Sequence, residues 1–253
     1  EPLELWESDP FEAQIRDGRI FARGVADNKG DLVARISAVD AYLKVRGGLP
    51  ITVKFLFEGE EEVGSPSLGE FVEEHRSLLS ADGCIWETGH KNSKGVPVLT
   101  LGVKGICYVE LEVEGARTDL HSSMAPIVPN PAWRLVWALS TLKDAEENIK
   151  IEGYGGDILP PSPRDLEILE KLDFDEKAEI EALGLSRFLL NLSGMELRRR
   201  LIFGPTCTIC GLESGYTGQG LKTVLPNKAR AKVDFRLVPN QEPQRVLELL
   251  RRH

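Results

Sequence analysis

One segment constrains the fold of this chain more than any other: a nearly continuous apolar run that ends in a row of glutamates. Residues 51–57 are rich in β-branched and aromatic side chains, and residues 58–62, which follow directly, contain four carboxylates. An apolar run of this length is typical of a strand that is buried in a sheet. The sequence therefore predicts a buried strand with clustered negative charge at its carboxyl end.

The first hundred residues continue with alternating strand and helix patterns. An Asp-Gly turn inside residues 14–21 predicts a hairpin, and helical spacing of apolar residues over 32–43 predicts a helix that ends at glycines 47–48. Another helix is expected near residues 65–66, and residues 83–86 form a second apolar run. Such alternation indicates an α/β fold with a parallel or mixed sheet, whose ligand sites lie at the carboxyl ends of strands.

The second half of the chain shows a different pattern. Apolar and charged residues alternate over 109–114 and again over 230–237, which predicts two strands that each have one solvated face. Helices are expected to begin at Asn130-Pro131 and near Glu242-Pro243, with a further strand over 207–212. This order of elements predicts a small α+β domain that is ferredoxin-like but lacks its last strand. We place the two domains at residues 1–104 and 105–253.

Composition excludes several classes of partner. With 31 Lys and Arg against 40 Asp and Glu, the net charge is −9, which argues against nucleic acids and anionic membranes as partners. No apolar run approaches the ~18 residues of a membrane-spanning helix, so no membrane segment is expected. Four cysteines are too few for a disulfide framework, so we expect a cytoplasmic protein. Because the chain begins with Glu1 and stops inside an expected helix, we expect a piece of a longer protein.

Carboxylates gather at the ends of the expected strands and turns. Asp27 lies between an extended segment and a helix start, the glutamates of 58–62 follow one apolar run, and Glu87 follows the other. Taken singly, each has a plain interpretation as a turn residue or a solvated acidic face. Taken together, their mutual repulsion is relieved by a bound cation. The pattern therefore favours a metal site.

Two other features have mainly structural interpretations. His121 is a lone histidine in an expected loop, a position that is usually only a surface position. Cys207 and Cys210 have CxxC spacing without a second pair, and within a strand their side chains would face opposite sides. We therefore expect structural cysteines, and we keep a redox protein as a weaker alternative that thiol reactivity would test.

Five segments in order carry a resemblance to a known family. They include Glu-Glu-Val-Gly-Ser and Asp-Leu-His-Ser, and they are residues 18–30, 61–65, 119–122, 222–226 and 236–240. Together they resemble the dizinc metallopeptidases, which include carnosinase-like dipeptidases, carboxypeptidase G, acetylornithine deacetylase and succinyl-diaminopimelate desuccinylase. The match is closest to the dipeptidase branch and weakest over residues 150–205.

The resemblance implies roles for four acidic residues. Asp27 would bridge two zinc ions, while Glu62 and Glu87 would each bind one of them. Glu61 would be the general base that activates the attacking water. Manganese and cobalt are alternatives to zinc, and the family's His-x-Asp motif and last zinc histidine are expected outside residues 1–253.

The resemblance also implies roles for three residues of the second domain. His121 would reach into the active site of a partner subunit and stabilise the oxyanion, and Thr223 and Arg236 would bind the substrate. The implied fold is a zinc-exopeptidase-like catalytic domain, partial here, with an inserted α+β lid domain that forms a homodimer.

The expected function is hydrolysis of the amide bond of dipeptides or other small peptides by a dizinc-activated water. An N-acyl-amino-acid deacylase is the alternative within the same chemistry. A non-catalytic dimerisation module that kept the fold is the alternative from another class, because ligands of the metal site are missing from the chain.

Overall fold

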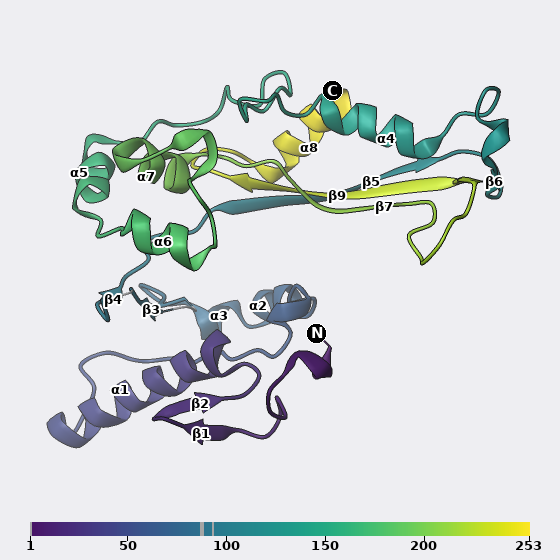
Figure 1. Ribbon diagram of the computed structural model, residues 1–253. Coiled ribbons are helices and arrows are strands. Elements are labelled where there is room, and N and C mark those ends of the chain that lie inside the picture. The colour runs from purple at the N-terminus through teal and green to yellow at the C-terminus, as the bar shows by residue number, and fades with distance from the viewer. Residues whose placement is uncertain (1, 87–88, 93) are drawn as a thin grey trace. The chain divides into compact units, whose positions relative to one another are not determined.

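The computed structural model describes residues 2–86, 89–92 and 94–253 (Figure 1). These residues form two compact units, Glu1–Thr100 and Leu101–His253, and each is described by itself.

Short elements make up the first unit. A hairpin and three helices account for most of its regular structure, in the order β1 (Gln14–Arg16), β2 (Arg19–Phe21), α1 (Gly30–Arg46), α2 (Leu68–Glu74), α3 (Arg76–Leu79), β3 (His90–Lys91) and β4 (Pro97–Val98). The hairpin pairs Gln14 with Phe21 across the expected Asp-Gly turn, and α1 ends where Gly47 adopts a left-handed conformation. Both features confirm the sequence prediction.

The two strands predicted over residues 51–57 and 83–86 are not formed. Neither segment is hydrogen-bonded into a sheet, and the ladders among the described residues of this unit are the antiparallel pairs β1–β2 and β3–β4. Phe57 is 53% exposed, and its ring stacks on that of Phe55 with centroids 5.5 Å apart. A buried strand needs neighbours on both edges and cover on both faces, and the described part of this unit supplies neither.

A three-stranded antiparallel sheet organises the second unit. Its order is β5-β9-β7, built from β5 (Gly105–Glu114), β7 (Thr208–Ser214) and β9 (Lys228–Leu237). Helices α4 (Pro131–Ser140) and α8 (Pro243–Arg252) pack on one face of it (Figure 1). The order strand–helix–strand–strand–helix agrees with the sequence prediction.

Alternation along β9 separates the buried face from the solvated face. Its apolar residues, which include Val233 and Phe235, pack beneath the two helices with Leu135 of α4 and Leu249 of α8. Both Val233 and Phe235 are 0% exposed. The charged residues of β9 lie on the opposite, open face, so the core and the polar surface of this unit follow from the period-two pattern.

The remaining elements lie at the two ends of the sheet in Figure 1. The two-residue ladder of β6 (Leu120–His121) and β8 (Val224–Leu225) lies at one end. Helices α5 (Pro163–Lys171), α6 (Glu176–Ala182) and α7 (Gly194–Phe203) lie toward the other. A capping box formed by Ser162 and Asp165 begins α5.

Candidate functional site

Asp27 lies in an irregular turn, Val25–Lys29, that leads directly into α1, and its own backbone angles (φ −128°, ψ 95°) are not helical. Gly24 begins this turn with a left-handed φ of 74°, which only glycine adopts freely. At its other end, a Cβ on Gly30 would lie 2.6 Å from the backbone oxygen of Val25. The two glycines therefore allow the sharp path that presents Asp27 at the surface.

The acidic segment after residue 57 is held by its own hydrogen bonds. Ser65 Oγ donates to Glu58 Oε1 over 2.5 Å, and the backbone N–H of Ser67 donates to Glu60 Oε2 over 3.2 Å. Glu61 and Glu62 lie in the short helical turn Glu61–Val63 between these contacts. Glu58 and Glu60 thus hold the loop in place. Glu61 and Glu62, the two glutamates with predicted functional roles, lie on that loop.

An ion pair joins the acidic segment to the chain that precedes the Asp27 turn. Arg23 Nη2 lies 3.4 Å from Glu62 Oε1. Arg23 immediately precedes Gly24, the first glycine of the turn. The structure therefore brings Glu62 against Arg23, two residues before the Asp27 turn, although 39 residues separate the two in the sequence.

Glu87, the third predicted metal ligand, lies outside the described residues. The described residues on either side of it lie against α1. Trp86 accepts a hydrogen bond on its carbonyl from Arg35 Nη2 over 2.8 Å, and a Cβ on Gly89 would lie 3.6 Å from Asp31 Oδ1. This segment therefore approaches the helix that follows the Asp27 turn.

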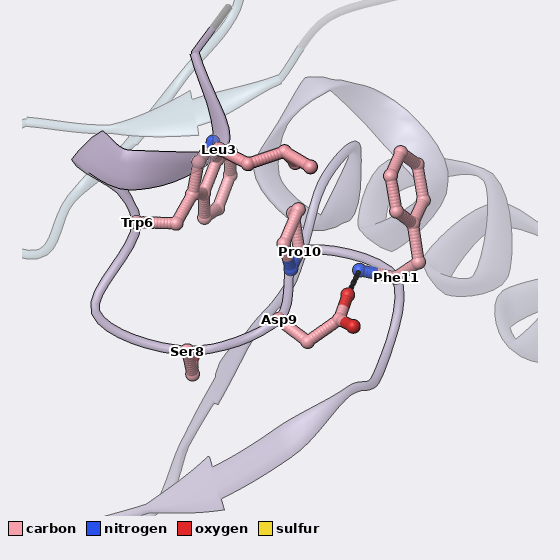
Figure 2. A pocket seen from close by; sticks show the side chains of 6 residues that line it. All are labelled: Leu3, Trp6, Ser8, Asp9, Pro10 and Phe11. Atoms are coloured by element: carbon pink, nitrogen blue, oxygen red, sulfur yellow. Dashed lines mark hydrogen bonds between the residues drawn. The ribbon is translucent and has the colours of Figure 1, made fainter.

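Two of the hollows formed by the described residues of the first unit differ in their distance from the acidic segment. One of about 190 Å³ lies at the acidic segment and is lined by residues that include Phe57, Glu58, Glu60 and Phe71. Another of about 300 Å³ is lined by Leu3, Trp6, Ser8, Asp9, Pro10 and Phe11 (Figure 2). Neither hollow is lined by a residue with a predicted role, but the first includes Glu60, which directly precedes Glu61.

The donor chemistry of this region suits a divalent cation, because carboxylate oxygens are its natural ligands. Among the described residues, however, no group of three or more His, Cys, Asp or Glu side chains is placed to hold a metal ion. The roles of Asp27 and Glu62 as metal ligands therefore stay predictions.

In the second unit the structure brings His121 and Thr223 together. Their side chains lie 3.1 Å apart between His121 Nε2 and Thr223 Oγ1, although 102 residues separate them in the sequence. Pairing of β6 with β8, which aligns His121 with Val224, produces this contact.

Hydrogen bonds at Nδ1 fix the proton position on His121. The backbone N–H of Ser123 donates to Nδ1 over 3.2 Å, and Ser123 Oγ lies 2.9 Å from the same atom. A backbone N–H can only donate, so Nδ1 is the acceptor and the proton of the neutral ring is on Nε2. His121 therefore presents an N–H donor on the side of Thr223.

Arg236 lies on the open face of β9, away from His121. Its Nε donates to Asp234 Oδ2 over 3.0 Å, and its backbone N–H donates to Thr206 Oγ1 over 3.2 Å. The side chain is half exposed, which leaves its guanidinium accessible to an anion.

The register of the sheet separates the two groups of residues. Arg236 pairs with Ile106 near one end of the β5–β9 ladder, whereas Lys228 and Glu114 pair at the other end, from which the chain continues to β6 and β8. Eight residues along β9 correspond to about 26 Å at ~3.3 Å per residue. A dipeptide spans roughly 7 Å, so one dipeptide cannot contact His121 and Arg236 of the same chain.

Sequence reasoning missed Arg23, Ser123 and Asp234, which hold predicted residues in place. Asp234 carried a signal, because it is the acidic member of a strand face that is otherwise basic at Lys232 and Arg236. Arg23 and Ser123 carried none, because their partners are set by the path of the backbone.

These features and the comparisons with known proteins define the class: the chain belongs to peptidase family M20/M25/M40, whose model matches residues 1–209. Among curated relatives, the Cys-Gly metallodipeptidase dug1 of Schizosaccharomyces pombe is 34% identical over 253 residues, covering 98% of this chain and 53% of that protein. Human β-Ala-His dipeptidase is 30% identical over 251 residues, covering 98% and 49% respectively. The chain thus spans about half the length of the curated relatives it matches.

Solved structures agree with this placement. The M20 family metallo-carboxypeptidase Sso-CP2 from Sulfolobus solfataricus has a TM-score of 0.93 and 43% identity, over 100% of this chain and 57% of that one. Human carnosine dipeptidase 1 has a TM-score of 0.73 and 27% identity, over 98% and 53%. The α/β fold expected from the sequence, with its mixture of helices and strands, is therefore confirmed at the level of the family.

Within the part of the chain that the structure describes, no helix has the length and apolar character needed to cross a membrane.

Proposed function

We propose that the complete protein carrying this chain is a zinc-dependent hydrolase that cleaves the amide bond of dipeptides. The observation that carries the proposal is the ion pair between Glu62 and Arg23, which lies two residues before the Asp27 turn. Relatives named as dipeptidases support the choice of substrate. Asp27, Glu62 and Glu87 are the residues of this chain that would contribute to binding two zinc ions, with manganese or cobalt as alternatives.

Each remaining residue has a chemical task. Divalent ions, when bound, supply Lewis acidity toward the carbonyl and lower the pKa of water. Glu61 accepts the proton of the attacking water and returns it to the leaving amine. His121 donates its Nε2–H to the developing oxyanion, and Thr223 beside it orients this donor and the substrate. Arg236 binds the terminal carboxylate of the substrate through a bidentate contact.

The distance along β9 supports a homodimer. Since the part of β9 from Lys228 to Arg236, about 26 Å long, lies between the end near His121 and Arg236, both residues act on one dipeptide only if His121 comes from a second copy. We therefore propose that the second unit is a lid that dimerises and exchanges His121 between active sites. We also propose a cytoplasmic location.

A carboxypeptidase is the second candidate function, because the M20 metallo-carboxypeptidase Sso-CP2 is 43% identical to this chain. Both activities need a free terminal carboxylate, but only a dipeptidase requires the free amino group of a dipeptide. Assays with Cys-Gly and with its N-acetylated form separate the two, since cleavage of the blocked peptide supports the carboxypeptidase. An N-acyl-amino-acid deacylase would release acetate from the same blocked compound.

Glu61→Gln tests the proposed mechanism in the complete protein. We expect kcat for Cys-Gly to fall by at least about 100-fold, because the general base is removed. The zinc content, measured by inductively coupled plasma mass spectrometry, should be unchanged. Glu74→Gln, at an exposed glutamate at the end of α2, is the matched control. Activity retained in Glu61→Gln would contradict the assignment of the base.

Mixing two inactive variants tests the exchange of His121. Subunits carrying Glu61→Gln and subunits carrying His121→Ala should recover activity when they are mixed, because one of the two sites in the mixed dimer receives both functional residues. No recovery, in mixtures shown by native mass spectrometry to contain mixed dimers, would place the complete site within one chain.

A further inference from the structure

A buried carboxylate occurs on the open face of the sheet in the second unit. Asp234 is 8% exposed, and it is the one charged residue that is buried within the described parts of the chain. It lies on β9, the central strand, between Tyr108 of β5 and Thr208 of β7. A carboxylate in such a position is costly unless it is paired, so its presence requires a partner.

Arg236 is that partner. Its Nε lies 3.0 Å from Asp234 Oδ2, while Asp234 Oδ1 has no hydrogen-bond partner among the described residues. The carboxylate thus depends on one guanidinium contact. Because Asp234 and Arg236 are two residues apart on one strand, they share a face, and the shorter side chain lies beneath the longer one.

The backbone of Arg236 is fixed as well. Its N–H donates to Thr206 Oγ1 over 3.2 Å, and its carbonyl accepts from the N–H of Thr206 over 3.1 Å. With the backbone and Nε both held, the two Nη groups remain, and neither has a hydrogen-bond partner among the residues described. Two parallel Nη donors on a fixed guanidinium match the two oxygens of a carboxylate.

A second cation lies close to this position without competing for Asp234. Lys104 Nζ donates to the carbonyl of Gly204 over 2.5 Å. Burial, and next the positive charge of Arg236, lower the pKa of Lys104. An anion that binds Arg236 therefore enters a locally positive region.

We propose that Asp234 is a positioning residue, which holds the Arg236 guanidinium through Nε so that both Nη groups face the C-terminal carboxylate of the substrate. This inference rests on the proposed function, because it takes the substrate to be a peptide with a free terminal carboxylate. It adds a residue that determines specificity for that carboxylate without touching it.

The test compares Cys-Gly with Cys-Gly amide in the complete protein. Arg236→Ala should raise KM for Cys-Gly by about 100-fold, the range for a lost charged hydrogen bond, and should leave KM for the amide unchanged. Asp234→Ala should raise KM for Cys-Gly roughly tenfold through lost ordering of the guanidinium, with kcat within about twofold. Asp234→Asn should recover most of the loss, because its amide oxygen still accepts from Nε.

Two further measurements separate positioning from folding. The double variant Asp234→Ala/Arg236→Ala should show the same KM as Arg236→Ala alone, since Asp234 acts only through Arg236. In the NMR spectrum, the Arg236 Nε–H signal should be sharp in the wild type and broadened by exchange in Asp234→Ala. Glu112→Gln is the matched control, because Glu112 lies on the same face but pairs with Lys228 and Arg230.

The possible outcomes distinguish a failure of this inference from a failure of the proposed function. Equal effects of Asp234→Ala on Cys-Gly and its amide, additive effects in the double variant, or an unchanged Nε–H signal would overturn the inference while the function stands. An Arg236→Ala variant with unchanged selectivity, or a wild type that hydrolyses neither compound, would overturn the proposed carboxylate recognition and the inference with it.

Discussion

The two units differ in where they place their apolar side chains. In Leu101–His253, a continuous core forms beneath α4 and α8 and includes Leu135, Val233 and Phe235. In Glu1–Thr100, Pro10 is the single buried residue among those described. The second unit therefore encloses its own core, whereas the first presents an apolar surface along residues 51–57.

The contrast shows that the two kinds of fold need different numbers of neighbouring strands and helices to bury their apolar residues. An antiparallel sheet covered by helices on one face can bury its apolar residues with a few elements that are adjacent in sequence. A parallel sheet needs strands on both edges and helices on both faces. The family to which the chain belongs has relatives about twice its length, and the unit with the α/β pattern is the one that lacks cover.

Replacement of a core residue should give the largest effect. Phe235→Ala should lower the free energy of unfolding of the second unit by about 3–5 kcal/mol, because Phe235 is fully buried and its removal leaves a cavity. Phe57→Ala should change the free energy of unfolding of the first unit by no more than about 0.5 kcal/mol, because the Phe57 side chain is half exposed. Urea unfolding of the 253-residue chain measures both.

A large effect of Phe57→Ala in the 253-residue chain would show that the first unit buries this side chain, contrary to its half-exposed position. In the complete protein, a large effect of the same substitution would show that the rest of the protein covers Phe57. The difference between the two measurements would report burial of residues 51–57 by the rest of the protein.

Gly30→Ala should give the next largest effect, in the first unit. A Cβ there would lie 2.6 Å from the backbone oxygen of Val25, so the Asp27 turn must shift. A displacement of about 1 Å can cost up to about 100-fold in rate, so we expect kcat for Cys-Gly in the complete protein to fall by that order. Gly48→Ala is the control, because nothing lies within 4 Å of its Cβ position. Equal activity of the two variants would show that the turn tolerates the shift.

Prediction from sequence succeeded where local patterns decide the structure. The period-two alternation of β5 and β9, Asn130 before α4 and the glycine after α1 each specify an element through contacts close in sequence. The strands over 51–57 and 83–86 were wrong, because an apolar run indicates burial but does not provide the neighbours that cause it.

The candidate site was predictable in its residues but not in its geometry. Motif order gave Asp27, Glu61, His121 and Arg236 as candidates, and their roles remain predictions. The sequence could not show that His121 joins Thr223 while Arg236 lies at the far end of β9, because strand register sets that separation. It also could not show Asp234 beneath Arg236, since burial of one charged residue depends on both neighbouring strands.

Cysteine reactivity offers the smallest effect and tests the redox alternative. Cys207 is buried and Cys210, the extra residue at a bulge in β7, is exposed, so their side chains do not face each other as a redox pair would. Burial raises the pKa of Cys207 to about 11. A thiol-specific probe at pH 8 should label Cys84 and Cys210 in the folded chain, and should label Cys107 and Cys207 at least about tenfold more slowly, through opening of the structure.

The same burial sets the sign of an alkaline effect. Because the folded pKa of Cys207 lies above the unfolded value of 9.0, the stability contributed by its neutral form is complete below pH 9. That contribution declines as the pH rises from 9 to about 11. Cys207→Ala should remove this part of the decline in urea midpoint between pH 8 and pH 11, whereas Cys210→Ala should leave it in place. An unchanged decline in Cys207→Ala, or rapid labelling of Cys207 at pH 8, would show that the core beneath β9 opens as readily as the surface of the first unit.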